Sequence, residues 1–447
     1  MIKLEDHPIV KRYNQKPRPK SSKPQPKLDS EWLRNLCLEA GADDVGFVEI
    51  DRPEIDKDRK DILAVFPRTK TLVSIVCRMN REPIRSPARS IANTEFHQIG
   101  DRVNEVCHRI VSVLESQGIR AINPAMGFPM EMDRWSTGKI WTVSHKLIAI
   151  AAGLGQMGIH RNVIHPKFGS FILLGTILTE AEVTYYDKQI DYNPCVKCKL
   201  CVAACPTGAI GADGHFNFSA CYTHNYREFM GGFVDWVENI AESKNAKEYR
   251  SKVSDAETVS MWQSLSFSAN YKAAYCIGVC PAGEDVIGPF LDDRKNYLQD
   301  VVRPLQEKKE TVYVVPNSDA ESYVARRFPH KTTKRVSNGL RSTSVKRFLR
   351  GLSLAFQRDQ SEGLNATYHF TFTGEEACEA TVVIKNKTIQ VYDEHIGTPN
   401  LHVTADSRTW LGFLMKERSL IWALLTRKIR IKGSPRLLKN FGKCFPS

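Results

Sequence analysis

The chain has 447 residues, enough for two to four domains with separate hydrophobic cores. Its 42% hydrophobic and 25% charged residues are typical of globular proteins, and no apolar stretch approaches the roughly 20 residues of a membrane span. The net charge is +13, and the first residues lack the apolar segment of a secretory signal. Seven of the 12 cysteines cluster within residues 195–280, which indicates metal ligation and not a disulfide framework. These features exclude a membrane-embedded or disulfide-stapled class and predict a protein of the reducing cytoplasm.

Residues 1–28 are predicted to be a flexible basic tail. Residues 1–30 contain eight Lys or Arg, several interleaved with proline as KPRPK and KPQPK, and such a composition cannot bury a core. A second basic block, from Arg326 to Arg350, has nine Lys or Arg and no acid. Blocks of this kind are commonly solvated, but they also contact RNA, anionic membranes or acidic redox partners.

Residues 29–188 are predicted to form a core of mixed helices and strands. The stretch SEWLRNLCLEAGADDVGFVEI has the pattern of an amphipathic helix, a glycine turn and a strand. Apolar runs at 71–77 and 170–180 indicate buried strands, and residues 101–118 have apolar positions at helical spacing. The alternation predicts an α+β or α/β fold and not a helical bundle.

The run GLGQMG places Gly153, Gly155 and Gly158 at the spacing of a dinucleotide-binding loop. The context of such a loop is missing, because a helical pattern precedes the run and no suitable acid follows it. The glycines therefore favour a close approach to another large, flat cofactor. His145 and His160 flank this turn and are the preferred candidates for a proton donor in a reduction.

The most informative element is CVKCKLCVAAC, which is followed by Pro206. It places Cys195, Cys198, Cys201 and Cys205 at the spacing of the bacterial ferredoxin ligand run. Short loops with this spacing wrap three thiolates around one iron–sulfur cluster, and the fourth thiolate reaches a second cluster. A structural zinc site is the alternative, but zinc ligands usually occur as two separated pairs. The run predicts a ferredoxin-type domain that transfers electrons.

A second element, AAYCIGVCPAG, ends in the same Cys-Pro pair, and Cys221 stands alone between the two elements. By this symmetry the first predicted cluster is held by Cys195, Cys198, Cys201 and Cys280. The second is held by Cys205, Cys221 and Cys276, which is one thiolate short. A non-cysteine ligand such as His224 could complete a 4Fe–4S cluster, or the cluster could be of the 3Fe–4S type, and the sequence leaves both alternatives open.

The rest of the chain divides into three parts. Residues 189–300 hold the clustered cysteines and a helical insert, and residues 301–343 are predicted to be a basic linker. Residues 344–447 predict a separate small α+β domain, with period-two runs ATYHFTFT, ATVVIK, KTIQVYD and LHVTAD. Its first helix has one apolar face, which indicates a core-facing helix rather than a membrane-surface helix: Val345, Phe348, Leu349, Leu352 and Phe356. Five isolated cysteines are predicted to be buried apolar thiols: Cys37, Cys77, Cys107, Cys378 and Cys444.

The stretch HKLIAIAAGLGQMGIHRNVIHPKFGSFILLGTILTE, followed by NPCVKCKLCVAACPTGAI and CIGVCP, resembles epoxyqueuosine reductases and reductive dehalogenases over about residues 30–290. The resemblance implies a nitroreductase-like α/β core that binds cobalamin, two 4Fe–4S clusters and reduction at cobalt. Two departures stand out. Ala273 replaces the first cysteine of the family's second element, and IWTVSHK offers no match for the family's acid upstream of the GLG turn, so no catalytic acid is assigned.

Residues 345–445 resemble a sterol-carrier-protein-type domain, most clearly in YHFTFTG and in LLTRKIRIKGSPRLLKNF. This resemblance implies a lipid-sized cavity between a sheet and helices, or a purely structural or dimerising use of the same fold. The epoxyqueuosine reductases' C-terminal helical portion, which is related to tRNA, has no counterpart here.

Three hypotheses are compatible with these features. In the first, the protein is an oxidoreductase, an iron–sulfur and cobalamin-dependent reductase that receives electrons from ferredoxin or flavodoxin and acts on a hydrophobic or lipid-like substrate. In the second, it is an electron-transfer protein without a corrinoid, and its C-terminal domain docks a partner. In the third, it reduces epoxyqueuosine in tRNA and uses the basic blocks to contact phosphates.

Overall fold

The computed structural model describes residues 3–15, 27–132, 134 and 139–446. The predicted basic tail lies partly outside this set. Its described part, residues 3–15, forms a 3₁₀ turn (Leu4–Asp6) and helix α1 (Pro8–Gln15), and neither buries a residue. Of the described helices, none combines the length and apolarity that a bilayer crossing requires.

A four-stranded sheet forms the centre of the N-terminal core, with the order β1-β2-β6-β3. Its strands are β1 (Asp44–Glu49), β2 (Thr71–Arg78), β6 (Ile172–Thr179) and β3 (Ala121–Ile122). The predicted strands at 71–77 and 170–180 are confirmed as β2 and β6. All three pairings are antiparallel, so of the two fold classes left open the core is α+β.

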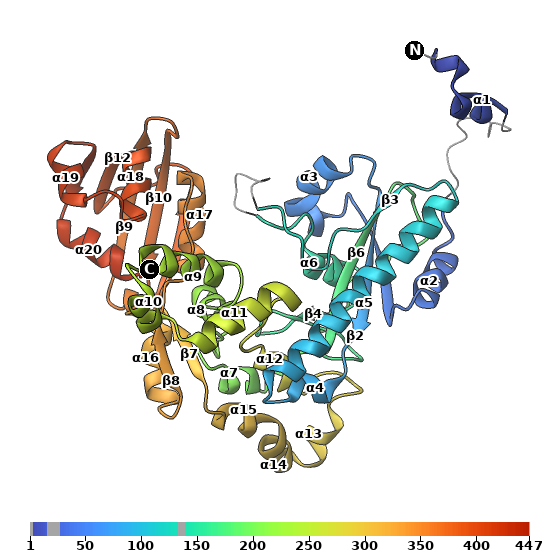
Figure 1. Ribbon diagram of the computed structural model, residues 1–447, viewed down its shortest axis with the longest axis horizontal. Coiled ribbons are helices and arrows are strands. Elements are labelled where there is room, and N and C mark those ends of the chain that lie inside the picture. The colour runs from blue at the N-terminus through green and yellow to red at the C-terminus, as the bar shows by residue number, and fades with distance from the viewer. Residues whose placement is uncertain (1–2, 16–26, 133, 135–138, 447) are drawn as a thin grey trace.

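Helices cover both faces of this sheet (Figure 1). Alternate β2 residues, Val73 and Ile75, pack under α2 (Ser30–Glu39) and α5 (Arg89–Ser116). The intervening Leu72 and Val76 face the opposite layer, which includes α3 (Asp56–Val65) and α6 (His145–Ala151). Because side chains alternate along a strand, a continuous apolar run such as β2 needs cover on both sides.

The cysteine-bearing domain is built from short helices (Figure 1). Three of them carry or border cysteines: α7 (Leu200–Ala204), α8 (Phe218–Asn225) and α12 (Tyr275–Gly278). The predicted helical insert is confirmed as α9 (Gly231–Glu242), α10 (Ala246–Lys252) and α11 (Asp255–Phe267). Beyond the second cysteine element follow α13 (Gly288–Asp292) and α14 (Arg294–Tyr297).

The segment 301–343 is folded and differs in this from the predicted basic linker. It contains α15 (Arg303–Glu307), β7 (Thr311–Val314), α16 (Asp319–Arg327) and β8 (Thr332–Arg335), and β7 pairs with β8 in parallel. Its apolar residues Val312, Val314 and Val324 are buried against the cysteine-bearing domain. The basic residues lie mostly on the exposed sides of these elements. The prediction of a linker was wrong because it used the charge of the segment and not its buried apolar residues.

The C-terminal domain has a five-stranded sheet with the order β11-β10-β9-β12-β13. Its strands are β9 (Ala366–Thr373), β10 (Cys378–Lys385), β11 (Thr388–Tyr392), β12 (Leu401–Asp406) and β13 (Ile429–Gly433). Its helices are α17 (Val345–Ala355), α18 (Ser407–Leu414), α19 (Leu420–Leu425) and α20 (Pro435–Lys443). The predicted apolar face of α17 is confirmed, because Val345, Phe348, Leu349, Leu352 and Phe356 are all buried. The predicted small α+β domain is thus present, and α17 packs against α8 of the cysteine-bearing domain.

Candidate iron–sulfur site

The two cysteine elements have the same local architecture. Helix α7 follows Lys199 and ends at Cys205, and helix α12 follows Ala274 and leads to Cys280. Lys197, Lys199 and Ala274 all have positive φ, at 51°, 62° and 66°. Left-handed residues in a turn direct successive backbone N–H groups into a concavity that binds anions, including the sulfurs of clusters. The two short helices pack against each other, so the elements form one unit.

The first cysteine set comprises Cys195, Cys198, Cys201 and Cys280. Burial, with smaller contributions from the neighbouring Cys198 and Cys195 thiolates, raises the pKa of Cys280 to about 11. Burial likewise raises the pKa of Cys201, whose interacting neighbours include the other members of the set. The structure therefore brings together four thiols from segments separated by most of the cysteine-bearing domain.

The second set comprises Cys205, Cys221 and Cys276. Burial, and then the Cys205 thiolate, raises the pKa of Cys276 to about 12. Burial and then the charges of Cys205 and Cys276 raise the pKa of Cys221. These three thiols are mutual neighbours, and Cys201 and Cys280 interact with Cys276, so the two sets lie side by side.

The donor chemistry of both sets suits iron–sulfur clusters. Backbone N–H groups of Leu200 and Ala282 donate to the sulfurs of Cys198 and Cys280, and the Ser170 hydroxyl, which donates to the carbonyl oxygen of Ile277 at 3.1 Å, lies beside Cys280. Hydrogen bonds to the sulfurs help to set cluster potentials. Within the described ranges, no three His, Cys, Asp or Glu side chains converge closely enough for one metal ion. Thiolates are the usual ligands of iron–sulfur clusters, and the assignment of these cysteines to clusters stays a prediction.

The position of the missing thiol is occupied by the methyl group of Ala273. Ala273 is buried, and its backbone N–H donates to Asn225 Oδ1 at 2.8 Å. The core contributes two polar groups to the second set from around the glycine turn. Asn162 Nδ2 lies 4.0 Å from Cys276 Sγ, and Lys146 Nζ donates to Asn162 Oδ1 at 3.0 Å. Lys146 also lies within electrostatic range of Cys221 and Cys276.

No sequence spacing singles out Asn162 or Lys146, and neither was assigned to the site from the sequence. Lys146 lies on α6 and Asn162 follows the glycine turn, so both belong to the sheet core. Their neighbour Cys276 comes more than a hundred positions later. Only the packing of the core on the cysteine-bearing domain brings these groups together.

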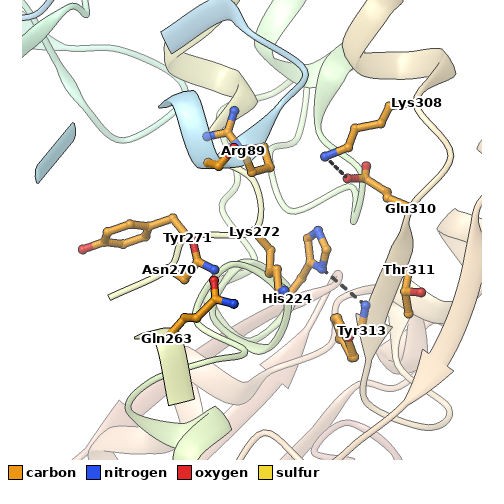
Figure 2. Close-up of a pocket in the computed structure, with 11 residues that line it drawn as sticks. Arg89, His224, Gln263, Asn270, Tyr271, Lys272, Lys308, Glu310, Thr311 and Tyr313 are labelled. Atoms are coloured by element: carbon orange, nitrogen blue, oxygen red, sulfur yellow. Dashed lines mark hydrogen bonds and ion pairs between the residues drawn. The ribbon is translucent and has the colours of Figure 1, made fainter. Parts of the chain in front are cut away.

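His224, the suggested fourth ligand, is committed elsewhere. It lies on α8 three residues after Cys221, but its Nδ1 accepts a hydrogen bond from the Tyr313 N–H at 3.3 Å. Burial lowers the pKa of His224 to about 4, so the ring is neutral and its proton lies on Nε2. Figure 2 shows this ring in a cavity with Glu310 and Lys308. The geometry therefore does not favour His224 as an iron ligand.

The three glycines of the GLG turn are surrounded by the protein's own atoms. A side chain at Gly153 would collide with the carbonyl oxygen of Lys188, and one at Gly155 with that of Ile164. Gly153 and Gly155 also have φ of +75° and +151°. Close backbone packing thus accounts for these glycines, and a cofactor contact at them stays a prediction.

The two candidate proton donors, His145 and His160, differ in how many of their ring nitrogens have hydrogen-bond partners. His145 Nδ1 lies 2.9 Å from Thr176 Oγ1, and its Nε2 lies 3.1 Å from the carbonyl oxygen of Ala125, so both nitrogens have partners. His160 is 3% exposed, and its Nδ1 accepts from the Asn162 N–H at 3.1 Å. Its Nε2 is buried without a partner. Burial, and then the charge of Lys146, lowers the pKa of His160 to about 4, so the ring is neutral. Because Nδ1 accepts a hydrogen bond, the single proton of the ring lies on Nε2.

The space around the glycine turn is too small for cobalamin. The cavity beside His145 measures about 20 Å³, and the glycines are packed against the chain itself. A corrin ring needs far more room than this, so the described residues at these two places do not accommodate it.

The fold and the cysteine sets define a multidomain α+β protein with a ferredoxin-type iron–sulfur domain. Residues 188–211 match the 4Fe-4S binding domain family, and residues 346–446 match the SCP-2 sterol transfer family. Over 155 residues the chain is 30% identical to an epoxyqueuosine reductase from Gloeobacter violaceus, a match that covers 35% of this chain and 46% of that relative. It is 32% identical over 103 residues to one from Cellulophaga algicola, covering 21% of this chain and 33% of the relative.

The chain is therefore similar to epoxyqueuosine reductases, and it spans less than half the length of these two curated relatives. Among solved structures, one epoxyqueuosine reductase in complex with a modified tRNA stem loop aligns with a TM-score of 0.31 at 20% identity, covering 43% of this chain and 56% of that chain. A catabolic reductive dehalogenase aligns with a TM-score of 0.33 at 17% identity, covering 44% of this chain and 27% of that chain.

Proposed function

We propose that this protein is an iron–sulfur reductase of the epoxyqueuosine reductase type, in which electrons enter at the first cysteine set and pass through the second to an acceptor in the sheet core. The observation that carries the proposal is that the seven cysteines form two adjacent sets around the packed helices α7 and α12, with Cys221 contributed by α8. Two neighbouring clusters relay single electrons, which is the chemistry that bound clusters would supply.

The first set is the proposed entry point because exposed and basic residues surround it. Val196, Lys197 and Lys199 are exposed beside its cysteines, and Arg294 lies within electrostatic range of Cys198. This basic surround complements an acidic carrier such as a ferredoxin or flavodoxin, and complementary charge accelerates the encounter of such partners.

The second set is the proposed exit toward the core. Asn162 donates to the Cys276 sulfur, and the ammonium of Lys146 lies close to the same thiols. A positive charge and a hydrogen-bond donor both stabilise the additional negative charge of a reduced centre. The neutral ring of His160 carries an Nε2–H in the same region, where it would donate a hydrogen bond to the negative charge that forms on a reduced acceptor; its low pKa disfavours the predicted role of proton donor.

Cobalamin is the acceptor that the family resemblance implies. Because the glycine turn and the cavity beside His145 do not accommodate a corrin ring, no step of this proposal is routed through it. The proposed substrate is a molecule that is reduced by electrons arriving through the second set, one at a time or in pairs.

The C-terminal domain is proposed to bind a lipid-like ligand. Its match to the SCP-2 sterol transfer family supports this, and so does the surface of α19, where Ile421, Trp422 and Leu425 are each about 70% exposed. Basic residues Lys416, Arg427 and Lys428 surround this apolar surface in the sequence. An apolar surface with basic flanks suits a ligand that is delivered from an anionic lipid surface.

The decisive experiment is anoxic purification followed by iron, sulfide and cobalt analysis and by electron paramagnetic resonance. The expected result is two reducible clusters per chain. Iron that is absent after reconstitution, or a single tetrahedral zinc, would remove the proposal. Cobalt retained after incubation with cobalamin would add a corrin to it. Its absence with intact clusters would favour the electron-transfer alternative.

A tRNA that carries epoxyqueuosine is the second candidate substrate, because the curated relatives are epoxyqueuosine reductases. Binding of a tRNA anticodon stem loop that survives moderate salt, together with loss of its epoxyqueuosine in a reducing assay, would support this candidate. Lipid extracted with the purified chain would support the lipid-like ligand.

A further inference from the structure

A cavity of about 370 Å³ lies between the sheet core, the cysteine-bearing domain and the 301–343 segment. Its wall includes Arg89 at the start of α5, His224 on α8, Lys272 in the loop before α12, and Lys308 and Glu310 before β7. Figure 2 shows these side chains around a common space. The volume is within the range of cavities that bind small molecules.

His224 directs an unsatisfied donor into this cavity. Its Nδ1 accepts the Tyr313 N–H, so the neutral ring must carry its proton on Nε2. The residue is 2% exposed, and no described residue forms a hydrogen bond with its Nε2. A buried donor without a partner costs stability, and an acceptor bound in the cavity would recover that cost.

Arg89 adds a cation without an acidic partner. Within the described residues no carboxylate pairs with its guanidinium, and its buried Nε also lacks a hydrogen bond. It is the first residue of α5, a helix of 28 residues whose N-cap, Ala88, makes no side-chain capping bond and whose first turn contains no acid. The start of such a helix attracts negative charge.

The remaining charges leave the cavity positive. Glu310 is the acid of the wall, and it is engaged by Lys331 at 2.7 Å and by the Tyr275 hydroxyl at 2.5 Å. Lys308 also approaches Glu310, at 3.3 Å, and Lys272 pairs with Glu228 behind the wall. The acids are thus engaged by other partners. Arg89 Nη1 donates to the carbonyl oxygen of Ser86 at 3.4 Å and its guanidinium lies over the Tyr275 ring, whereas Arg89 Nε and His224 Nε2 have no hydrogen-bond partner among the described residues.

We propose that this cavity binds an oxyanion group, a phosphate or a carboxylate, of a small molecule. The His224 Nε2–H and the Arg89 guanidinium donate to the oxyanion, and Lys308 adds positive charge beside it. This site uses none of the seven cysteines, although Arg89 lies within electrostatic range of Cys276, and it does not depend on the proposed reductase activity.

The test is calorimetric titration of the full chain, with its clusters reconstituted, with inorganic phosphate against chloride at equal ionic strength. We expect saturable phosphate binding that weakens roughly tenfold or more in His224→Phe and in Arg89→Met, since each removes a donor to a charged group. Arg326→Met, which removes an exposed arginine elsewhere, serves as the matched control and should bind phosphate as the wild type does.

Phosphate that binds no better than chloride would overturn the proposal, and so would two folded variants that bind as tightly as the wild type. If one variant fails to fold, the other decides, because the two residues lie on different helices. Acetate that displaces phosphate would assign the site to carboxylates as well, and acetate that does not would restrict it to phosphates. Iron content, measured in each variant, separates this outcome from any loss of clusters.

Discussion

Lys199 and Ala274 have nearly the same left-handed backbone conformation, with φ, ψ of 62°, 16° and 66°, 23°, and each directly precedes a short helix that carries cysteines. Residues with side chains occupy this region at a cost of about 1–3 kcal/mol. The same costly conformation at two places far apart in the sequence indicates that the same loop geometry is needed twice. A loop that wraps sulfur ligands around a cluster has this need.

The two cysteine sets can be separated by single substitutions. Cys201→Ser removes a ligand of the first set and Cys221→Ser one of the second, so each should lower the iron content by about half and abolish one resonance signal. Cys378→Ser, on β10 in the C-terminal domain, is the control and should change neither. Equal loss of iron in all three variants would contradict the division into two sets.

Lys146 should influence the potential of the second set. The positive charge of Lys146 lies near Cys221 and Cys276 and would stabilise the reduced, more negative cluster. Lys146→Gln removes this charge. We expect the potential of that cluster to fall by on the order of 50 mV, with the other cluster little changed. Redox titration followed by electron paramagnetic resonance measures both. The exposed Lys295→Gln is the control, and an equal shift there would indicate a general charge effect.

Two glycines should respond to alanine in opposite directions. Gly155→Ala places a methyl group against the carbonyl oxygen of Ile164 at φ +151°, so it should destabilise the core by about 3 kcal/mol or more. Gly351 lies inside α17 with open space around it, and Gly351→Ala should stabilise by about 0.5–1 kcal/mol. Denaturant unfolding compares the two, and a tolerated Gly155→Ala would show that the turn is looser than its packing indicates.

Lys331 is a buried cation that holds the 301–343 segment together. Its Nζ donates to Glu310 at 2.7 Å and to the carbonyl oxygens of Leu305 and Lys308, at 3.2 and 2.9 Å. Lys331→Met leaves a buried carboxylate with a weaker partner, so the free energy of unfolding should fall by about 3 kcal/mol. Lys295→Met should change it by less than about 0.5 kcal/mol. A linker with no folded role would lose no stability in either variant.

His402 should make the stability of the C-terminal domain depend on pH. Burial, and then the charges of His395 and His369, lowers its pKa below 6.5, so the folded domain prefers the neutral ring. The unfolded chain binds the proton more readily, and stability is therefore full above about pH 6.5 and falls as the pH drops through that value. His402→Gln should reduce the loss of melting temperature between about pH 7 and about pH 5. The exposed His108→Gln should leave that loss unchanged, and an unchanged loss in both variants would reject the assignment.

Short-range patterns in the sequence determined a large part of this protein. The strands β2 and β6, the helical insert and the buried face of α17 all follow from apolar spacing within a few residues, and the structure has each of them. The Cys-x-x-Cys run needs only local geometry, and residues 188–211 match the 4Fe-4S binding domain family. Patterns of this range are encoded by neighbours along the chain, so they can be recognised without the fold.

Contacts between distant segments were decided by the tertiary structure alone. The approach of Asn162 to Cys276 and the engagement of His224 by Tyr313 join residues separated by 114 and 89 positions, and no local pattern specifies either pair. The segment 301–343 appeared to be a linker because its charge is visible in the sequence, whereas the surface that buries Val312 and Val324 is formed only when the cysteine-bearing domain folds. Spacing therefore determined which cysteines the chain offers, and packing determined which other groups surround them.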